Sequence, residues 1–337
     1  MNIIVLIDKF KGSISSIRLG KITKSTLERK GHNVDYFPIS DGGNGFLDTI
    51  LYNKNVKKRY AYAHDALNNK KKVMYLMDNE NVYIEVAKII GINKENTFDI
   101  YNATTYGVGE VILNAIKKGG KNFFVGLGGS ITNDGGKGML NALGYEIINN
   151  KLVNNSSIDL SQYTFNIISD VTSPLLGNNG ATYMFSRQKG AKEKDLIILE
   201  NNMKEYCKII NEYTNIDYSN KQGAGAAGGL GFAFLSILKA NYIDGIKFVL
   251  SYLKIDEIID KYDLIITGEG KIDEQSLNGK IVFEILKRYN KKTLLLCGVS
   301  TISHDNLYSI VPSITDANNS MKRVSYYYKK LLESIKL

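Results

Sequence analysis

One glycine-rich loop dominates the middle of the chain: Val125-Gly126-Leu127-Gly128-Gly129-Ser130-Ile131-Thr132-Asn133-Asp134-Gly135-Gly136. The apolar segment that leads into it, residues 122–125, is typical of a short buried strand, and a helix to about residue 143 is predicted after it. Glycine permits positive φ and lets a ligand come close to backbone N–H groups. Successive N–H groups at a helix start attract anions, so this loop is a candidate phosphate cradle.

Asp134 does not suit a loop that only binds anions. A carboxylate beside a phosphate normally needs a cation between them, and Mg²⁺ is the usual one. An equally weighted interpretation is a glycine-rich turn that ends in a helix cap. The candidate binding residues of the loop are Gly128, Gly129, Ser130, Thr132 and Asn133, with Asp134 as a catalytic or metal-binding carboxylate.

The chain of 337 residues is longer than one hydrophobic core usually supports, which favours two domains. Strand and helix patterns alternate near both ends, whereas residues 60–90 alternate like antiparallel strands. We therefore predict a two-domain α/β protein with its active site in the cleft. Residues 1–60 and 255–337 would form a Rossmann-like α/β domain, and residues 61–254 a central mixed α/β domain.

Individual elements are predicted from the same patterns. Strands are expected at 3–7, 34–39, 73–77, 82–86, 263–267 and 294–297. Helices are expected at 14–30, 46–50, 104–119, 192–211, 228–240 and 275–288, and residues 149–161 as a polar surface excursion.

Further motifs follow one another along the chain. They are Ile7-Asp8-Lys9-Phe10-Lys11-Gly12-Ser13, Ser40-Asp41-Gly42-Gly43-Asn44-Gly45, Asp170-Val171-Thr172-Ser173-Pro174-Leu175-Leu176-Gly177, Gln188-Lys189-Gly190-Ala191, Gly223-Ala224-Gly225-Ala226-Ala227-Gly228-Gly229-Leu230-Gly231 and Thr267-Gly268-Glu269-Gly270-Lys271-Ile272-Asp273. In this order, the set resembles the class I glycerate kinases, from Ile3 to about Gly298.

The resemblance implies an enzyme that transfers the γ-phosphoryl group of ATP to a hydroxyl of D-glycerate with Mg²⁺. It also implies 2-phosphoglycerate as the product, although the residues themselves leave the hydroxyl open. Four positions depart from the family pattern: Lys9 stands for a small residue, Asn44 for Glu, Arg187 for Pro and Lys271 for Arg.

The N-terminal motif supplies candidates at the carboxyl end of a strand, where α/β proteins bind ligands. Lys11 and Ser13 are placed to contact a phosphate, and Lys9 is interpreted as solvated with its role open. Asp8 could orient Lys11, accept the substrate proton or cap the next helix. Asp41 lies in a similar loop and is a binding candidate.

The later motifs add carboxylates and cations. Glu269 is a catalytic candidate, and Asp273 is either a metal ligand or a helix cap. Asp170 is a further metal candidate, and Lys189 either contacts phosphate or is solvated. The remaining binding candidates are Gly225 and Lys271.

Composition and motifs limit the alternatives. The Walker A pattern GxxxxGK[ST] is absent from the sequence, and the two cysteines have no metal-site spacing. The run from Gly223 to Gly228 fits GxGxxG, which keeps an NAD(P)-dependent oxidoreductase as an alternative, but the residues before it are polar. A net charge of +9 keeps a nucleic-acid-binding protein as a second alternative.

No apolar run reaches the length of a membrane helix or a signal-peptide core. We expect a cytoplasmic protein that uses small-molecule substrates without nucleic acid or membrane, and leave a homodimer open. Thr104 and Thr105 are expected to cap the following helix. Replacing Lys11 or Asp134 is expected to impair catalysis and leave the fold intact.

Overall fold

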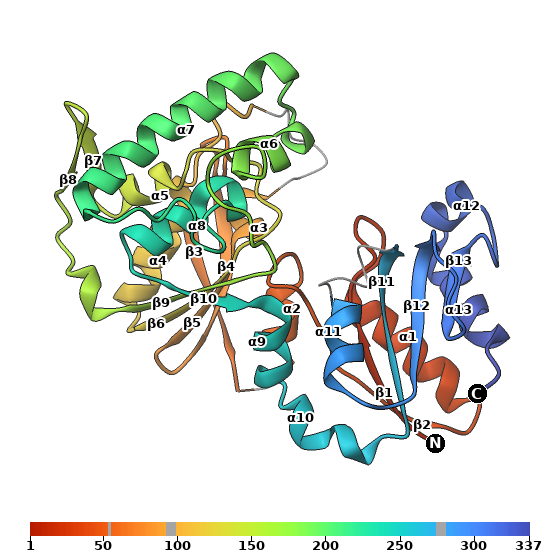
Figure 1. Ribbon diagram of the computed structural model, residues 1–337. Helices are drawn as coiled ribbons and strands as arrows, with labels where there is room; N and C mark the ends of the chain where they lie inside the picture. Colours follow the sequence, from red (N-terminus) through yellow and green to blue (C-terminus); the bar gives the residue numbers. More distant parts are fainter. Residues whose placement is uncertain (53–54, 92–98, 274–280) are drawn as a thin grey trace. The chain divides into compact units, whose positions relative to one another are not determined.

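The structure, a computed structural model, describes residues 1–52, 55–91, 99–273 and 281–337. The chain divides into two compact units (Figure 1). Unit 1 consists of Met1–Asp41, Asp48–Asn53 and Ile246–Leu337, and unit 2 of Gly42–Leu47 and Lys54–Gly245. The predicted division at residues 60/61 and 254/255 differs from the one at Asn53/Lys54 and Gly245/Ile246, and Gly42–Leu47 belongs to unit 2. The predicted domain bounds stay a prediction.

Unit 1 contains one fully parallel sheet of five strands. In sheet order these are β13 (Leu307–Val311), β12 (Thr293–Ser300), β11 (Leu264–Ile272), β1 (Asn2–Ile7) and β2 (Asn33–Tyr36). Residues 3–7 of β1 are all buried, because helices cover both faces of a parallel sheet and its central strands have no exposed side.

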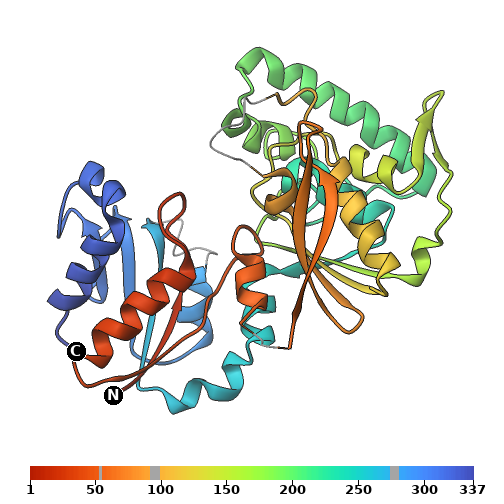
Figure 2. The ribbon, with the colours of Figure 1, turned by 180° about the vertical axis from the view of Figure 1, so that it is seen from behind.

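Two hydrophobic cores lie on the two faces of this sheet. One contains side chains from α1 (Ser16–Glu28) and α13 (Val324–Ser334), and the other contains side chains from α9 (Gly245–Tyr252) and α11 (Ile281–Arg288). Figure 1 shows α11 on the near face and Figure 2 shows α1 on the opposite one. The remaining helices of this unit are α10 (Ile255–Ile258), η3 (Ile259–Lys261) and α12 (Ala317–Lys322).

Unit 2 contains a mixed sheet of six strands. In sheet order these are β10 (Asn241–Asp244), β9 (Thr164–Ser169), β6 (Asn122–Gly126), β5 (Asn81–Glu85), β4 (Lys70–Asp78) and β3 (Lys57–His64). The strands from β10 to β5 are parallel, whereas β4 and β3 add antiparallel pairs. This antiparallel extension explains the change of pattern in residues 60–90.

The helices of unit 2 pack against one large hydrophobic cluster and a smaller one. They are α3 (Val86–Ile90), α4 (Tyr106–Lys117), α5 (Lys137–Ala142), η1 (Leu160–Gln162), α6 (Ala181–Phe185), η2 (Arg187–Lys189), α7 (Glu193–Thr214) and α8 (Ala226–Ser236). A separate hairpin, β7 (Tyr145–Ile148) with β8 (Lys151–Asn154), lies beside α7. The short helix α2 (Phe46–Ile50) spans the division between the units.

The predicted two-domain α/β fold class is confirmed, and most predicted elements occur within a few residues of their expected positions. Three differences stand out. The polar stretch 149–161 contains strand β8 and the start of the 3₁₀ helix η1, and the helix expected at 228–240 ends at Ser236. The expected helix 275–288 is described only from Ile281, because residues 274–280 lie outside the described ranges.

Candidate active site

The carboxyl edge of the unit 1 sheet gathers the residues of the N-terminal motif. Strand β1 ends at Ile7, and the backbone N–H of Asp8 donates to the carbonyl of Gly268 at 3.0 Å. Asp41 follows β2, which pairs with the other side of β1. Ligands of open α/β sheets bind at this edge, as the sequence predicts for Asp8 and Asp41.

Lys9 lies between these two carboxylates. Its Nζ is 3.3 Å from Asp8 Oδ2 and 3.5 Å from Asp41 Oδ1. Its side chain is only 19% exposed, so the interpretation of Lys9 as a solvated lysine is wrong. Sequence reasoning left the role of Lys9 open and did not predict its pairing with Asp8 and Asp41. The available signal was its place at a strand end, with a second aspartate loop following the next strand.

Burial and charge act in opposite directions on this group. Burial and the charge of Asp41 raise the pKa of Asp8, the ammonium of Lys9 acts to lower it, and the net value is about 7. Burial lowers the pKa of Lys9, but the carboxylates of Asp41 and Asp8 outweigh burial and leave it above its usual value. Lys9 is therefore charged throughout the physiological range, and Asp8 titrates near neutrality.

Lys11 and Ser13 lie in a tight loop before α1. The hydroxyl of Ser13 donates to the carbonyl of Phe10 at 2.9 Å, and Gly12 has a φ of +77°. Lys11 is exposed, and its ammonium makes no hydrogen bond or ion pair within the described part of the chain. It is thus available to a ligand, whereas the Ser13 hydroxyl already closes the loop.

The carboxyl end of β11 carries three of the predicted residues. Lys271 pairs with Asp273 at 3.0 Å, and Glu269 is in register with Cys297 of β12. Gly270 packs closely on the N-terminal loop, because a Cβ there would lie 3.2 Å from the backbone N of Lys11. Whether Asp273 caps the next helix concerns residues outside the described ranges.

In unit 2, the loop between β6 and α5 has the glycine conformations expected of a tight loop. Gly129, Gly135 and Gly136 have φ values of +71°, +65° and +81°. A Cβ on Gly128 would lie 2.6 Å from Cα of Gly43, so the Gly42–Gly43 turn packs directly on the loop. Side chains at these glycines would strain or separate the two segments.

Asp134 accepts four hydrogen bonds from the starts of two helices. The backbone N–H and hydroxyl of Thr105 donate to it at 2.8 Å each, and the N–H groups of Gly136 and Gly138 donate at 3.1 Å each. Burial raises its pKa, and these donors act to lower it. They give Asp134 a structural task, joining α4 to α5, and its catalytic and metal-binding roles stay predictions.

Thr105 stands at the N-cap position of α4, but its side chain makes no capping hydrogen bond, so the predicted cap is absent there. The hydroxyl of Thr104, one residue earlier, accepts from the N–H of Tyr106 at 3.2 Å. The hydroxyl of Thr105 instead donates to Asp134 and accepts from the N–H of Met139 at 2.9 Å. The partnership of Thr105 with Asp134 was not predicted.

Lys189 is buried beneath the same loop. It is 3% exposed, and its Nζ donates to the carbonyl of Thr132 at 2.7 Å. Burial lowers its pKa to about 8, and the negative charge of Asp134 acts in the opposite direction. The alternative of a solvated lysine is therefore wrong, whereas phosphate contact by Lys189 stays a prediction.

Two buried polar atoms of the loop have no hydrogen-bond partner among the described residues. They are the hydroxyl of Ser130 and the side-chain carbonyl of Asn133, whose amide donates to Thr182 at 3.3 Å. Buried polar atoms are normally satisfied, so these two are available to a ligand or to water. This property supports Ser130 and Asn133 as binding candidates.

The second glycine loop packs against the first. A Cβ on Gly228 would lie 1.9 Å from the carbonyl oxygen of Thr132, and one on Gly225 would lie 2.3 Å from that of Pro174. Residues 215–222 contain no strand and follow helix α7. The context that a dinucleotide fingerprint requires is therefore missing, and Gly225 is packed against protein.

Arg187 and Asn44, the two remaining departures from the family pattern, both lie against other residues of the chain. Arg187 forms an exposed two-bond ion pair with Glu193, at 2.6 and 2.9 Å. Asn44 lies over Gly129, where a Cβ would come within 2.3 Å of the Asn44 side-chain oxygen. Asp170, at the end of β9, is exposed.

The described residues contain no group of three or more acidic, histidine or cysteine side chains arranged to hold a metal ion. Mg²⁺ is commonly bound by one or two carboxylates together with substrate phosphates. A site of that kind would need fewer protein carboxylates than a metal cage made by the protein alone. Asp134 suits it least, because its oxygens already accept four bonds.

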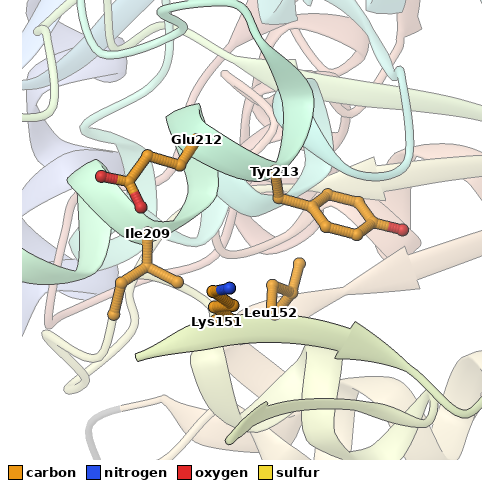
Figure 3. A pocket seen from close by; sticks show the side chains of 5 residues that line it. All are labelled: Lys151, Leu152, Ile209, Glu212 and Tyr213. Atoms are coloured by element: carbon orange, nitrogen blue, oxygen red, sulfur yellow. The ribbon is translucent and has the colours of Figure 1, made fainter. Parts of the chain in front are cut away.

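A small pocket lies elsewhere in unit 2, between α7 and the β7–β8 hairpin (Figure 3). Its volume is about 210 Å³, and it is lined by Lys151, Leu152, Ile209, Glu212 and Tyr213. It is smaller than typical small-molecule sites and contains none of the motif residues. We do not assign it to the active site.

The match to known families covers almost the whole chain. A family model described as "Glycerate kinase family" matches residues 3–336. The chain belongs to the glycerate kinase family. Members of this family are ATP-dependent kinases, so the predicted family and enzyme class are confirmed.

Individual relatives agree with this membership. A "Glycerate 2-kinase" of Escherichia coli is 32% identical, covering 93% of this chain and 91% of the relative. A "Glycerate kinase" of Bacillus cereus is 36% identical, covering 86% and 82%. A crystal structure assigned to glycerate kinase 2 of Salmonella typhimurium LT2 has a TM-score of 0.80 at 28% identity, covering 98% and 96%.

The described part of the chain includes no helix with the length and apolar character needed to cross a membrane.

Proposed function

We propose that this chain transfers the γ-phosphoryl group of ATP to a hydroxyl of D-glycerate and yields 2-phosphoglycerate. The match of the glycerate kinase family model to residues 3–336 is the observation that carries this proposal. The name of the Escherichia coli relative supports the 2-phosphate product. The missing strand before Gly223 weighs against the oxidoreductase alternative.

Asp8 is our candidate for the proton acceptor. A general base works best when its pKa lies near the working pH, and burial is the main reason that the pKa of Asp8 is raised to about 7. The glycerate hydroxyl would lose its proton to Asp8 as its oxygen bonds to the γ-phosphorus. The bond from that phosphorus to the bridging oxygen breaks, and ADP leaves with the bonding electrons.

The other unit 1 candidates have binding or electrostatic roles. Lys11 is proposed to neutralise phosphate charge with its exposed ammonium, and Glu269 to act beside the reacting hydroxyl. Lys271, Ser13 and Asp41 are proposed binding residues. The Ser13 hydroxyl would have to exchange its bond to Phe10 for a ligand.

In unit 2, the glycine loop is proposed to hold a ligand through Gly128, Gly129, Thr132 and the two side chains with available polar atoms, Ser130 and Asn133. Lys189 and Gly225 are retained as binding candidates, although both already contact protein. Asp134 is retained as a catalytic candidate that would act by holding the loop in place.

We further propose a requirement for Mg²⁺, bound together with ATP. Asp170, Asp273 and Asp134 are the proposed protein contacts. When bound, the metal would neutralise phosphate charge. A cytoplasmic location and a homodimer also stay predictions.

Phosphorus NMR on the purified protein tests the activity directly. With ATP, Mg²⁺ and D-glycerate, we expect ADP and the 2-phosphate ester to form together. Omission of glycerate should abolish ADP formation, and chelation of Mg²⁺ should do the same. Formation of the 3-phosphate ester would overturn the proposed product but leave the kinase assignment in place.

A further inference from the structure

The two lysines of the N-terminal motif lie in different surroundings, although one residue separates them. The ammonium of Lys11 is exposed, whereas that of Lys9 lies 3.3 Å from Asp8 and 3.5 Å from Asp41. One cation therefore serves two carboxylates at the carboxyl edge of the sheet. The loss of Lys9 would remove the ammonium that lies within 3.5 Å of both carboxylates.

We propose that Lys9 is a positioning residue whose ammonium keeps the Asp8 carboxylate ionised and in place beside Asp41. This inference rests on the proposed function, in which Asp8 accepts the substrate proton. Lys9 would then set the lower end of the pH range in which the enzyme is active. Neither the family match nor the motif pattern assigns it this role.

The pKa of Asp8 depends strongly on the charge of Lys9, because burial and the charge of Asp41 act in the opposite direction. Burial and Asp41 both favour the protonated carboxyl, and Lys9 is the main opposing charge. With all three present, the pKa of Asp8 is about 7. An opposite charge at this distance typically lowers a carboxyl pKa by about 1–3 units, so its removal would move Asp8 out of the physiological range.

Other charged groups near β1 act on Asp8 less strongly than Lys9 and Asp41. On the neighbouring strand β11, Lys271 is paired with Asp273, and Glu269 lies beside Cys297 of β12. The helices that cover this sheet carry the following charged residues: Arg18, Lys21, Lys24 and Glu28 on α1, Lys247 on α9, Glu284, Lys287 and Arg288 on α11, and Lys329, Lys330 and Glu333 on α13.

Carbon-13 NMR of the Asp8 carboxyl in the protein without ligands tests the coupling without any assay of activity. Aspartate labelled at the carboxyl carbon supplies the signal, and Asp8→Asn identifies it. We expect the Asp8 pKa to rise by at least one unit in Lys9→Met and to stay near the wild-type value in Lys9→Arg. Lys21→Met, an exposed position on α1, is the matched control and should change nothing.

Asp41→Asn supplies a test of opposite sign, which also serves if Lys9→Met fails to fold. This change removes the negative charge of Asp41, which raises the pKa of Asp8. The pKa of Asp8 should therefore fall. A pKa in Lys9→Met within about 0.3 unit of wild type, or a rise in Asp41→Asn, would overturn the proposal.

The pH profile of kcat/KM then tests the role in the reaction. The acid limb should move to higher pH in Lys9→Met by the amount that NMR measures, so that kcat/KM at pH 7 falls roughly tenfold relative to its own plateau. An NMR shift without movement of the acid limb would refute the role of Lys9 in the reaction. A wild-type protein without kinase activity would instead refute the proposed function, and the NMR titration would still decide the coupling.

Discussion

At the scale of single residues, the structure distinguishes three lysines that the sequence places in similar glycine-containing motifs. Lys11 is exposed, Lys9 joins two carboxylates and Lys189 is buried under a loop. Sequence could place all three near ligand-binding loops, because strand ends and glycines are visible in it. It could not assign their partners, since a side chain's direction depends on the packing of segments far apart in the chain.

Lys11→Ala is expected to lower kcat/KM by at least about 10²-fold, the usual scale for the loss of one preorganised electrostatic group. Its ammonium makes no hydrogen bond or ion pair with the other described residues, so the thermal unfolding temperature should not change. Steady-state kinetics measures kcat/KM and calorimetry measures the unfolding temperature, with Lys21→Ala as the control. A kcat/KM near the wild-type value would show that Lys11 is a surface lysine without a role in catalysis.

Lys189 predicts a pH dependence of stability. The pKa of Lys189 is about 8 in the folded protein, whereas the ordinary pKa of a lysine is 10.5. Because the folded state releases this proton at lower pH, the unfolded state binds more protons between these values and stability rises with pH there. The destabilising effect of the buried charge is fully present below pH 8.

The measurement is urea unfolding of wild type and Lys189→Met from pH 7 to 10.5. The wild type should gain stability relative to the variant across this window, by on the order of 2–3 kcal/mol. A difference that stays constant with pH would show that Lys189 is not held in the way that we describe.

At the scale of elements, the predictable parts were those with a strong local pattern. The buried apolar run of β1 and the alternation in β4 and β5 gave their positions directly. Strand β8 was missed because Lys151–Asn154 has only four residues, and among the described strands it pairs with β7 alone. The basic run Lys57-Lys58-Arg59 opens the edge strand β3, where exposed charges discourage pairing with other chains.

Asp134 connects the starts of two helices, α4 and α5. Its four hydrogen bonds do not agree with the expectation that Asp134→Asn leaves the fold intact. An amide nitrogen in place of one oxygen would face N–H donors, so we expect a loss of roughly 2–4 kcal/mol of stability. Chemical unfolding measures this.

The partner residue supplies the matched control for Asp134. Thr105→Val should lose about 1–2 kcal/mol, since its hydroxyl both donates to Asp134 and accepts from Met139. Thr105→Ser should keep most of the wild-type stability. Asp134→Asn with unchanged stability would contradict the structural role and strengthen the purely catalytic one.

The packing of the two glycine loops gives another prediction. Gly228→Ala would place a methyl group 1.9 Å from the carbonyl oxygen of Thr132, at a φ of +69°. We expect a loss of at least about 2 kcal/mol and weaker activity, because the loop at Thr132 must move.

Gly177→Ala is the control, since φ there is +86° but nothing lies within 4 Å of the added methyl. It should cost only the backbone strain, about 1 kcal/mol. Equal losses in the two variants, measured by chemical unfolding, would show that the contact between the loops is unimportant.

At the scale of the whole molecule, the order of seven weak motifs carried the family assignment, which the match over residues 3–336 confirms. The net charge of +9, which also suited a nucleic-acid-binding protein, was much less informative. The hydroxyl that is phosphorylated could not be predicted from sequence, because regiochemistry depends on how glycerate lies in its site. The contribution of each candidate residue depends on the same geometry.

The central claim is that the chain phosphorylates D-glycerate with ATP, and one measurement tests it most directly. Phosphorus NMR of the protein with ATP, Mg²⁺ and D-glycerate should show equal amounts of ADP and 2-phosphoglycerate accumulating with time. Unchanged ATP, together with oxidation of NADH in the presence of a small keto acid, would contradict the claim and favour the oxidoreductase.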